Sequence, residues 1–262
     1  MIRPNKFLGQ NFLKSAKIAE EIVEVAEIKP EDIVLEVGPG RGVLTELLIK
    51  KAKKVIAIEK DERLVEFLRE KFAGEIKNGQ LEIACGDILE FNHVNYPLKT
   101  GSYKIVANIP YYITSRFLRN FLSSDKYPYL MILMVQKEVA ERIRAKDGKE
   151  SLLSISVKAY GQPKIIRKVP AGYFSPAPKV DSAVIKIVAI SKSFFKSITE
   201  KSFFELAKKG FSQKRKMLIN NLGLGNGIFE VCGVPLKARA ENLSLENWKC
   251  LVKNNVNKKE SF

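Results

Sequence analysis

Residues 33–42 read Ile-Val-Leu-Glu-Val-Gly-Pro-Gly-Arg-Gly and decide the fold, because they join a strand to a helix through glycines. The apolar run Ile33–Val37 predicts a buried strand of a parallel sheet. Residues 43–50 follow with leucines at helical spacing. Glycines in such a turn let backbone approach a ligand closely. Strand, turn and helix in this order predict the nucleotide-binding edge of a doubly wound α/β fold.

The spacing of the glycines narrows the choice of ligand. A dinucleotide fingerprint has the pattern G-x-G-x-x-G, whereas residues 38–42 read G-x-G-x-G and Val43 stands in the place of the last glycine. This departure argues against a bound pyrophosphate and favours a smaller ligand lying across the turn. A nicotinamide-dependent oxidoreductase is therefore a disfavoured alternative.

Acidic residues follow the next two predicted strands. Val55–Ile58 ends in Glu59, at the position where doubly wound folds bind ribose hydroxyls. Leu81–Ala84 leads to Asp87, a candidate acceptor for the amine of a bound adenine. Either acid alone is more often a helix cap or a solvated loop residue, so the interpretation depends on their order along the chain.

A fourth strand end carries N-I-P-Y-Y-I at residues 108–113, a motif that suits a planar, hydrogen-bonding base. The exocyclic amine of such a base is a weak nucleophile, because its lone pair is delocalised into the ring. Hydrogen bonds to the Asn108 side-chain oxygen and to a backbone carbonyl near Ile109 or Pro110 would draw the amine toward tetrahedral geometry. Tyr111 would stack on the base, a contact worth about 1–3 kcal/mol. Alone, N-x-P-Y can also be an ordinary strand-to-loop turn.

Strand-like and helical segments alternate in the first part of the chain, which predicts a mostly parallel sheet with helices on both faces. Ile165–Val169 and Ser182–Ala189 are expected to form an antiparallel pair at its end. From Ser191 onward no strand pattern remains. We therefore predict an α/β domain over residues 1–190 and a small all-α domain over residues 191–262. The predicted helices are Ala16–Glu27, Arg63–Phe72, Ser115–Leu122, Glu138–Arg144, Leu152–Tyr160, Phe203–Phe211, Arg215–Leu222, Gly227–Val231 and Leu245–Val252.

The charge of the chain favours a nucleic-acid partner. It has 45 Lys and Arg against 29 Asp and Glu, a formal net charge of +16, which is typical of proteins that bind nucleic acid or anionic surfaces. Residues 191–262 hold 14 of the basic residues against 6 acidic ones, so the excess is densest there. The densest basic cluster is at residues 208–216, and a solvated helix face is its alternative interpretation. The expected contact residues are Lys208, Lys209, Lys214, Arg215 and Lys216.

No metal site is expected. Cys85, Cys232 and Cys250 have no C-x-x-C spacing and no histidine partners, which argues against zinc. Without an apolar export signal, these cysteines are expected to be reduced thiols in the cytoplasm. His93 is the only histidine and lies in a polar, turn-like stretch. No apolar run reaches membrane-spanning length, and no stretch resembles an obligate interface, so we expect a monomer away from membranes.

Five short motifs extend this pattern along the chain. They are G-Q-N-F-L at residues 9–13, E-V-G-P-G-R-G at 36–42, N-I-P-Y at 108–111, F-S-P-A-P-K-V-D-S-A-V at 174–184 and R-A-E-N-L-S at 239–244. Together they resemble the S-adenosylmethionine-dependent rRNA adenine N6,N6-dimethyltransferases, and among these the kasugamycin-sensitivity type. The resemblance extends from Lys6 to about Leu251. It implies a Rossmann-like methyltransferase domain with a mostly parallel seven-stranded sheet, followed by a small helical domain.

The resemblance implies which residues bind S-adenosylmethionine. The two N-terminal ones would close over the cofactor, the glycines would contact it at the turn, and the two acids would bind its ribose and its adenine. Asn108 would serve both the cofactor and the target amine. The implied cofactor residues are Asn11, Leu13, Gly38, Gly40, Glu59, Asp87 and Asn108.

The target adenine would be held by Asn108, Pro110, Tyr111 and Phe174, with the two aromatic rings sandwiching the base. Tyr112 departs from the family pattern, in which a smaller polar residue such as asparagine is expected. The rim of the pocket is therefore expected to differ.

The resemblance finally implies the reaction. Methyl groups would pass from S-adenosylmethionine to the N6 amines of two adjacent adenosines near the 3′ end of small-subunit rRNA, in an assembling subunit. Because the sulfonium already activates the methyl group, catalysis would depend on positioning and would need no metal. Two alternatives stay open: the antibiotic-resistance branch of the superfamily, which methylates large-subunit rRNA, and a non-catalytic RNA-binding relative.

Overall fold

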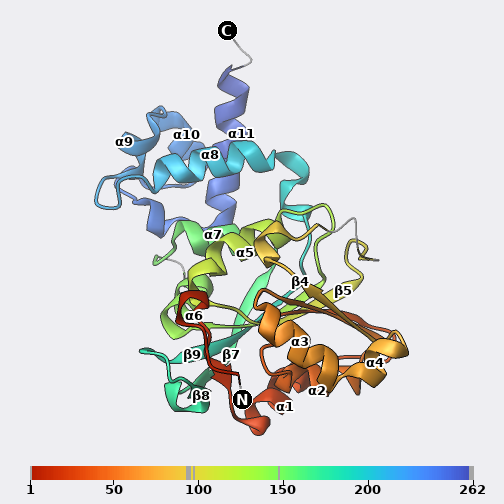
Figure 1. The fold of residues 1–262 in the computed structure, drawn as a ribbon. Coiled ribbons are helices and arrows are strands. Elements are labelled where there is room, and N and C mark those ends of the chain that lie inside the picture. The colour runs from red at the N-terminus through yellow and green to blue at the C-terminus, as the bar shows by residue number, and fades with distance from the viewer. Residues whose placement is uncertain (1, 93–95, 97, 147, 260–262) are drawn as a thin grey trace. The chain divides into compact units, whose positions relative to one another are not determined.

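The computed structural model describes residues 2–259 with the exception of residues 93–95, 97 and 147 (Figure 1). His93, for which no metal or acid-base role is expected, lies outside the described residues. The chain forms two compact units. The first comprises Met1–Ala140 and Gln162–Ile190, and the second comprises Glu141–Gly161 and Ser191–Phe262.

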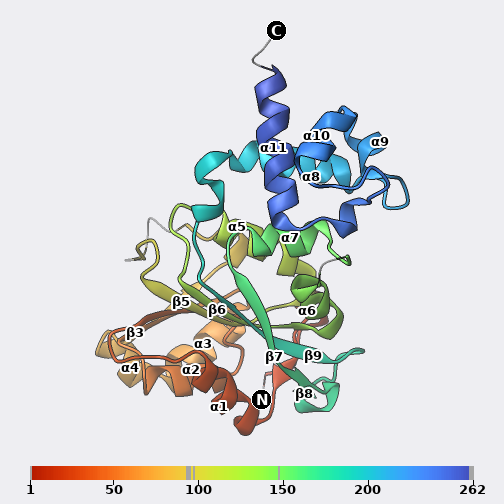
Figure 2. The ribbon, with the colours of Figure 1, turned by 180° about the vertical axis from the view of Figure 1, so that it is seen from behind.

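A seven-stranded sheet forms the centre of the first unit, in the order β4-β3-β2-β5-β6-β9-β7 (Figures 1 and 2). The parallel strands are β2 (Ile33–Val37), β3 (Lys54–Glu59), β4 (Leu81–Cys85), β5 (Tyr103–Asn108) and β6 (Leu130–Gln136). β9 (Ser182–Val188) pairs antiparallel with β6, and β7 (Gln162–Val169) pairs antiparallel with β9. The predicted mostly parallel sheet with its antiparallel end is confirmed.

The strand order reverses between β2 and β5, and this reversal positions the site. From β2 the chain adds β3 and β4 on one side, then crosses over to add β5 and β6 on the other. Val37 of β2 is paired with Ile58 of β3 and with Ala107 of β5, so the three strands end at the same level. In open α/β sheets, ligands bind in the crevice outside the carboxyl ends of strands at such a switch point.

Helices bury both faces of the sheet. On one face, α1 (Ala16–Val25), α2 (Val43–Ile49) and α3 (Glu62–Lys71) contribute to the core cluster that also contains strand residues such as Val34 and Val55. Strand residues of the opposite face, including Leu35, Ile56 and Ile105, are fully buried as well. Burial on both faces explains why these strands read as continuous apolar runs. α4 (Ala73–Lys77) and α5 (Thr114–Leu122) also belong to this unit, whereas α6 (Lys137–Arg144) begins in it and ends in the second unit.

The second unit is helical, as predicted, but it includes a segment that the prediction assigned to the first domain. Its helices are α7 (Leu152–Lys158), α8 (Glu200–Gly210), α9 (Leu218–Leu222), α10 (Asn226–Val231) and α11 (Leu245–Lys259). Ile155 and Ala159 of the α7 region are buried in the same cluster as Phe203 of α8 and Trp248 of α11. The predicted division at Ser191 therefore misses one segment: Glu141–Gly161 also belongs to the second unit. Trp248 is fully buried, as expected of a core residue.

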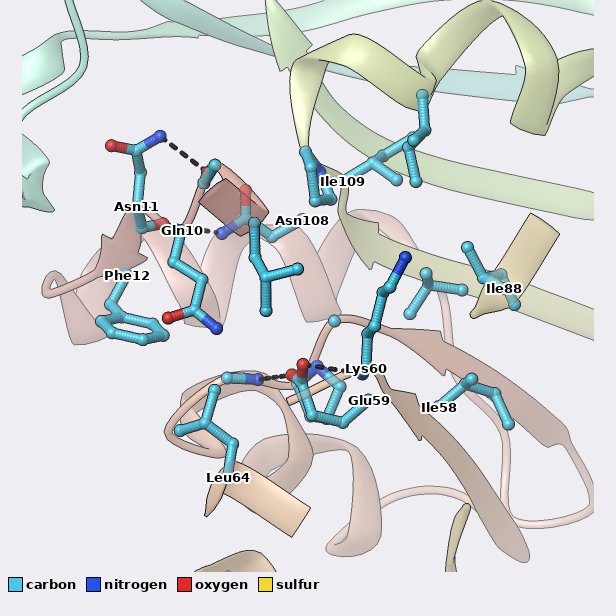
Figure 3. Close-up of a pocket in the computed structure, with 18 of the residues that line it drawn as sticks. Gln10, Asn11, Phe12, Ile58, Glu59, Lys60, Leu64, Ile88, Asn108 and Ile109 are labelled. Carbon is cyan, nitrogen blue, oxygen red and sulfur yellow. Dashed lines mark hydrogen bonds between the residues drawn. The ribbon is translucent and has the colours of Figure 1, made fainter. Parts of the chain in front are cut away.

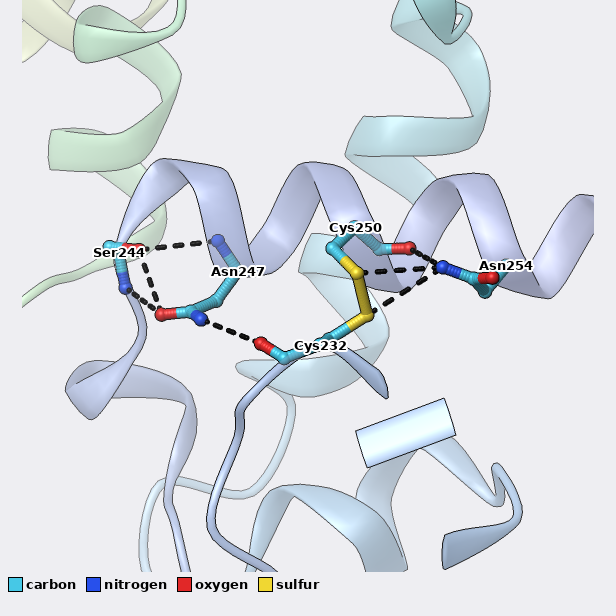
Figure 4. The surroundings of a disulfide bond; sticks show 5 residues. All are labelled: Cys232, Ser244, Asn247, Cys250 and Asn254. Carbon is cyan, nitrogen blue, oxygen red and sulfur yellow. Dashed lines mark hydrogen bonds between the residues drawn. A yellow bond between two sulfur atoms is a disulfide. The ribbon is translucent and has the colours of Figure 1, made fainter. Parts of the chain in front are cut away.

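The cysteines correct another expectation. Cys232, at the end of α10, and Cys250, in α11, form a disulfide across 18 residues of sequence (Figure 4). Asn247 and Asn254 donate hydrogen bonds to the backbone oxygens of Cys232 and Cys250, at 3.1 and 2.9 Å. The expectation of three reduced thiols is wrong in this structure, and only Cys85 is free. A search for C-x-x-C spacing cannot find this pair, because the two cysteines are 18 residues apart in the sequence. The packing of two helices brings them together.

In the described parts of the chain, no helix is both long and apolar enough to cross a membrane.

Candidate active site

A pocket opens at the carboxyl ends of β2, β3 and β5 (Figure 3). It is lined by residues 8–13, which we call the N-terminal strap, by the glycine-rich turn after β2, and by the segments that follow β3, β4 and β5. All of these belong to the first unit. Except for one aromatic residue and the basic cluster, the structure brings every predicted site residue to this pocket: Asn11, Leu13, Gly38, Gly40, Glu59, Asp87, Asn108, Pro110 and Tyr111.

The glycine-rich turn favours glycine at all three of its glycine positions. Gly40 has a positive φ of +59°, and a Cβ on it would lie 3.1 Å from the Phe12 ring. Gly38 and Gly42 have φ values of +67° and +77°, a region that other L-residues rarely adopt. A Cβ on Gly42 would lie 2.6 Å from the Phe72 ring, and one on Gly38 would lie 3.3 Å from the Asn108 backbone oxygen. The close approach keeps the ends of β2 and β5 side by side under the pocket.

Glu59 ties two loops together beneath the pocket (Figure 3). Its Oε1 accepts the N–H groups of Lys60 and Asp61 at 2.9 and 3.0 Å, and its Oε2 accepts that of Gly40 at 3.1 Å. Burial raises the pKa of this carboxyl, and the three backbone hydrogen bonds oppose the shift. A carboxylate offers about four acceptor positions. Three are used here, which leaves one on Oε2 for a ligand hydroxyl.

Glu36 lies behind the turn and is fully buried. Its Oε2 accepts the Thr45 hydroxyl at 2.7 Å, and its Oε1 has no partner among the described residues. Burial raises the pKa of Glu36 to about 8, and the charge of Glu59 adds to the shift. At neutral pH this carboxyl is therefore mostly protonated.

Glu36→Gln is expected to flatten the pH dependence of stability. Because the folded-state pKa of about 8 lies above the unfolded value of 4.5, the folded chain retains a proton that the unfolded chain releases. Stability should thus fall by about 1.4 kcal/mol per pH unit as the pH rises through this interval. Glutamine, which resembles the protonated acid, should remove that contribution. Urea unfolding at several pH values measures the slope, with the exposed Glu46→Gln as control. Equal slopes in wild type and Glu36→Gln would contradict a buried neutral acid.

Asp87 follows β4 and is a carboxylate. Burial opposes its ionisation, but hydrogen bonds from Lys60 and from the Leu89 N–H keep its pKa below the usual value. Lys60 Nζ lies 2.8 Å from Asp87 Oδ2. The charge predicted to accept an adenine amine is thus present, and Lys60 is a neighbour that the sequence did not indicate.

Contacts with two other segments hold the N-terminal strap in place. Gln10 Nε2 donates to Asp61 Oδ2 at 2.8 Å, and β1 (Phe12–Leu13) pairs antiparallel with β8 (Phe174–Ser175). Asn108 Nδ2 donates to the Asn11 backbone oxygen at 3.3 Å, and Figure 3 shows the two residues facing each other. This bond fixes the carboxamide and leaves Asn108 Oδ1 as an acceptor to which no described residue donates.

The two aromatic residues expected to sandwich a base are placed differently. Tyr111 lines the pocket, and its hydroxyl lies 2.7 Å from Ser182 Oγ on β9. Burial raises the pKa of Tyr111, so the phenol is neutral. Phe174 is only 2% exposed, packs in the core cluster and is not among the lining residues. Its ring offers no face to a ligand in this structure. Ser182 was not predicted as a site residue, although it stands in the same motif as Phe174.

The basic cluster lies in the second unit, around the end of α8 and the turn before α9. All five of its residues are exposed. Lys209 also has a structural role, since its Nζ donates to the Leu222 carbonyl at 2.5 Å. Phe211 stacks on Trp248 with ring centroids 5.6 Å apart and thus packs against the core of the second unit. The predicted helix from Arg215 begins only at Leu218, so Lys214, Arg215 and Lys216 lie in the turn. The other two residues of the cluster, Lys208 and Lys209, are on α8.

Comparisons with known proteins identify the family of this chain. The family described as "Ribosomal RNA adenine dimethylase" matches residues 1–258. "Ribosomal RNA small subunit methyltransferase A" of Dehalococcoides mccartyi is 44% identical over 261 residues, covering 96% of this chain and 89% of the relative. Among solved structures, a dimethyladenosine transferase from Plasmodium falciparum superposes with a TM-score of 0.80 at 29% identity, covering 95% of this chain and 98% of that one. The 23S rRNA methyltransferase ErmE superposes with a TM-score of 0.75 at 26% identity, covering 93% and 98%.

A family model thus matches almost the whole of a chain in which the glycine turn, Glu59 and Asn108 follow strands at the switch point of the sheet. The resemblance read from the five motifs is confirmed. The chain belongs to the ribosomal RNA adenine dimethylase family, whose members are S-adenosylmethionine-dependent methyltransferases.

Proposed function

We propose that this enzyme methylates the N6 amines of two adjacent adenosines near the 3′ end of small-subunit rRNA to N6,N6-dimethyladenosine. The observation that carries the proposal is the orientation of Asn108, whose amide nitrogen is bound to the strap while its Oδ1 has no donor among the described residues. Its relative named "Ribosomal RNA small subunit methyltransferase A" is 44% identical, whereas the large-subunit enzyme ErmE is 26% identical. This difference supports the small-subunit substrate.

The pocket residues fit S-adenosylmethionine. One acceptor position remains on Glu59 Oε2, suited to a ribose hydroxyl, and the carboxylate of Asp87 lies at the next strand end. A side chain at Gly38 would approach the Asn108 backbone to 3.3 Å, so this position of the turn favours glycine. The cofactor supplies a methyl group activated by its sulfonium.

The protein's contribution to the reaction is positioning. Asn108 Oδ1 would accept one hydrogen of the target amine, and a backbone carbonyl at Ile109 or Pro110 would accept the other. These two bonds would draw the nitrogen toward tetrahedral geometry, so that its lone pair is less delocalised into the ring and is directed toward the cofactor side of the pocket. Tyr111, held by Ser182, would lie against the base. Holding the reacting atoms in line in this way can account for a large part of the rate.

The basic cluster of the second unit is proposed to contact RNA phosphates. Changing Lys214, Arg215 and Lys216 together to glutamine should weaken RNA binding and lower the slope of log Kd against log salt by about 2–3. The slope is measured by filter binding at several salt concentrations. Lys50, Lys51 and Lys53, which are also exposed, give a matched neutralised control that should retain the wild-type slope. An unchanged slope in the first variant would remove the cluster from the interface.

Further proposals concern the setting of the reaction. We propose that the enzyme acts as a monomer, in the cytoplasm, on an assembling small subunit. Thiols in the cytoplasm are kept reduced. The proposed location therefore predicts that Cys232 and Cys250, which form a disulfide in this structure, are mostly reduced in cells. Alkylation of thiols in intact cells, followed by mass spectrometry of the chain, measures the oxidised fraction there.

The decisive experiment is mass spectrometry of nucleosides from rRNA incubated with the enzyme and labelled S-adenosylmethionine. Labelled N6,N6-dimethyladenosine in two adjacent positions of small-subunit rRNA is the expected result, located by primer extension. Label in large-subunit rRNA would favour the antibiotic-resistance branch. Binding of S-adenosylmethionine or RNA without any labelled nucleoside would favour a non-catalytic relative.

A further inference from the structure

Tyr112 is a pocket-lining residue to which the reaction above gives no role. It lies directly after the tethered Tyr111, yet its side chain is 65% exposed. Single exposed apolar residues are common on protein surfaces and need no explanation. This one differs, because its ring stands at the mouth of the pocket and its hydroxyl has no hydrogen-bond partner among the described residues.

The surroundings of the ring are basic. Lys60 lines the same pocket and forms an ion pair with Asp87 at 2.8 Å. Arg116 follows Tyr112 by four residues, at the start of α5, and is exposed. Its charge also lowers the pKa of Asp87, a residue that lines the pocket. No described residue forms a hydrogen bond or ion pair with Arg116.

An exposed ring beside an available cation suits one nucleotide of an RNA strand. Aromatic side chains stack on bases of any sequence, and arginine binds the phosphate. The target adenosine has to leave its stack to enter the pocket, and the nucleotide beside it then loses a stacking neighbour. Tyr111 is half-buried and held by Ser182 inside the pocket. Tyr112 also lines the pocket but is largely exposed, so its ring is available to a nucleotide beside the one inside.

We propose that Tyr112 stacks on the nucleotide adjacent to the target adenosine while Arg116 contacts its phosphate, so that the pair holds the RNA strand at the pocket mouth. The proposal rests on the proposed function for the identity of the target. Because two adjacent adenosines are modified there, the nucleotide on Tyr112 is the other adenosine in at least one of the two binding registers.

A competing role for Tyr112 is visible in the structure and has to be separated by experiment. A Cβ placed on Gly9 would lie 3.5 Å from the Tyr112 ring, so the ring also covers the N-terminal strap. If Tyr112 merely closed the strap over the cofactor, its loss would weaken S-adenosylmethionine binding. If it stacks on RNA, its loss affects the RNA alone.

The first test measures kinetics with a hairpin from the 3′ end of unmethylated small-subunit rRNA. Tyr112→Ala is expected to raise the KM for RNA about tenfold, with kcat and the Kd for S-adenosylmethionine close to wild type. Tyr112→Phe, which retains the ring, should behave as wild type. Arg116→Gln should raise the KM and lower the salt slope by about 1. Phe67→Ala removes an exposed ring outside the pocket lining and serves as control.

The second test detects stacking without turnover. 2-Aminopurine replaces the nucleotide on one side of the target or the other, and its fluorescence is read in the complex with S-adenosylhomocysteine. Quenching by wild type that is lost in Tyr112→Ala and kept in Tyr112→Phe supports stacking. An unchanged KM together with equal fluorescence in all variants overturns the proposal, and so does a KM that rises only in step with weaker cofactor binding. Quenching that depends on Tyr112, in an enzyme that leaves small-subunit rRNA unmethylated, would instead reject the proposed function and keep the stacking site.

Discussion

Asn108→Ala is expected to lower the rate of methyl transfer by about a hundredfold or more, the size of effect seen when a positioned hydrogen-bonding group is removed from an active site. The Oδ1 atom that this change removes has no donor among the described residues, so it is available to the target amine. Without it, the amine stays planar, its lone pair remains delocalised into the ring, and the nitrogen is a weak nucleophile.

Cofactor binding should weaken in the same variant but stay measurable. Asn108 Nδ2 donates to the Asn11 backbone at 3.3 Å, and its loss loosens one contact of the strap. The remaining strap contacts, including the Gln10 to Asp61 hydrogen bond, do not involve Asn108. Single-turnover methyl incorporation at saturating RNA and cofactor gives the rate, and calorimetry gives the Kd.

Asn78→Ala provides the matched control for Asn108→Ala. Asn78 is exposed, lies before β4 and is not among the pocket-lining residues. It should retain wild-type turnover and affinity. Wild-type methyl incorporation by Asn108→Ala would show that another group captures the amine hydrogens, and the proposed mechanism would have to be abandoned.

The pocket in the first unit could largely be predicted from sequence, because its residues follow strand ends. Strands buried on both faces appear as uninterrupted apolar runs, so their ends are visible without a structure. Parallel pairing then brings those ends to one edge of the sheet. The register Val37–Ile58 and Val37–Ala107 places Gly38, Glu59 and Asn108 side by side, as their order in the chain indicated.

Features that depend on contacts between distant segments could not be predicted in this way. Phe174 was assigned to the base through a motif, but an aromatic letter does not reveal whether its ring faces a cavity or the core. In this structure Phe174 pairs with Leu13, which is 161 residues earlier in the chain. This pairing accompanies a Phe174 ring that is buried in the core. The role of Phe174 against the base stays a prediction that would require this ring to move.

The helical unit shows the same limit. Cys232 and Cys250 are joined because α10 and α11 pack together, and no local pattern contains that information. The segment Glu141–Gly161 has helical spacing like its neighbours, yet Ile155 and Ala159 complete the core of the second unit. Amphipathic patterns show that a face is buried, but they do not show against which unit.

Glu59→Gln is expected to weaken S-adenosylmethionine binding by about 10- to 100-fold and to lower the stability of the first unit by about 1–3 kcal/mol. Three backbone N–H groups, from Gly40, Lys60 and Asp61, use acceptor positions on this carboxylate. A glutamine oxygen has two acceptor positions. If the glutamine oxygen accepts the N–H groups of Lys60 and Asp61, the amide NH2 points at the Gly40 N–H. The acceptor position left for a ribose hydroxyl is then lost.

The pH dependence of cofactor binding separates this explanation from a general loss of structure. Burial raises the pKa of Glu59, so its carboxylate is protonated at a higher pH than an exposed glutamate, and one oxygen then becomes a donor. Wild-type affinity should therefore decrease as the pH falls, and the decrease should begin at a higher pH than an ordinary glutamate would give, whereas Glu59→Gln should be weak and nearly constant. Glu62→Gln, an exposed acid in the first turn of α3, should follow the wild-type curve. Because the same carboxylate both closes the turn and accepts the ligand, a Glu59→Gln enzyme that binds cofactor as tightly as wild type at neutral pH would show that the ribose is bound elsewhere.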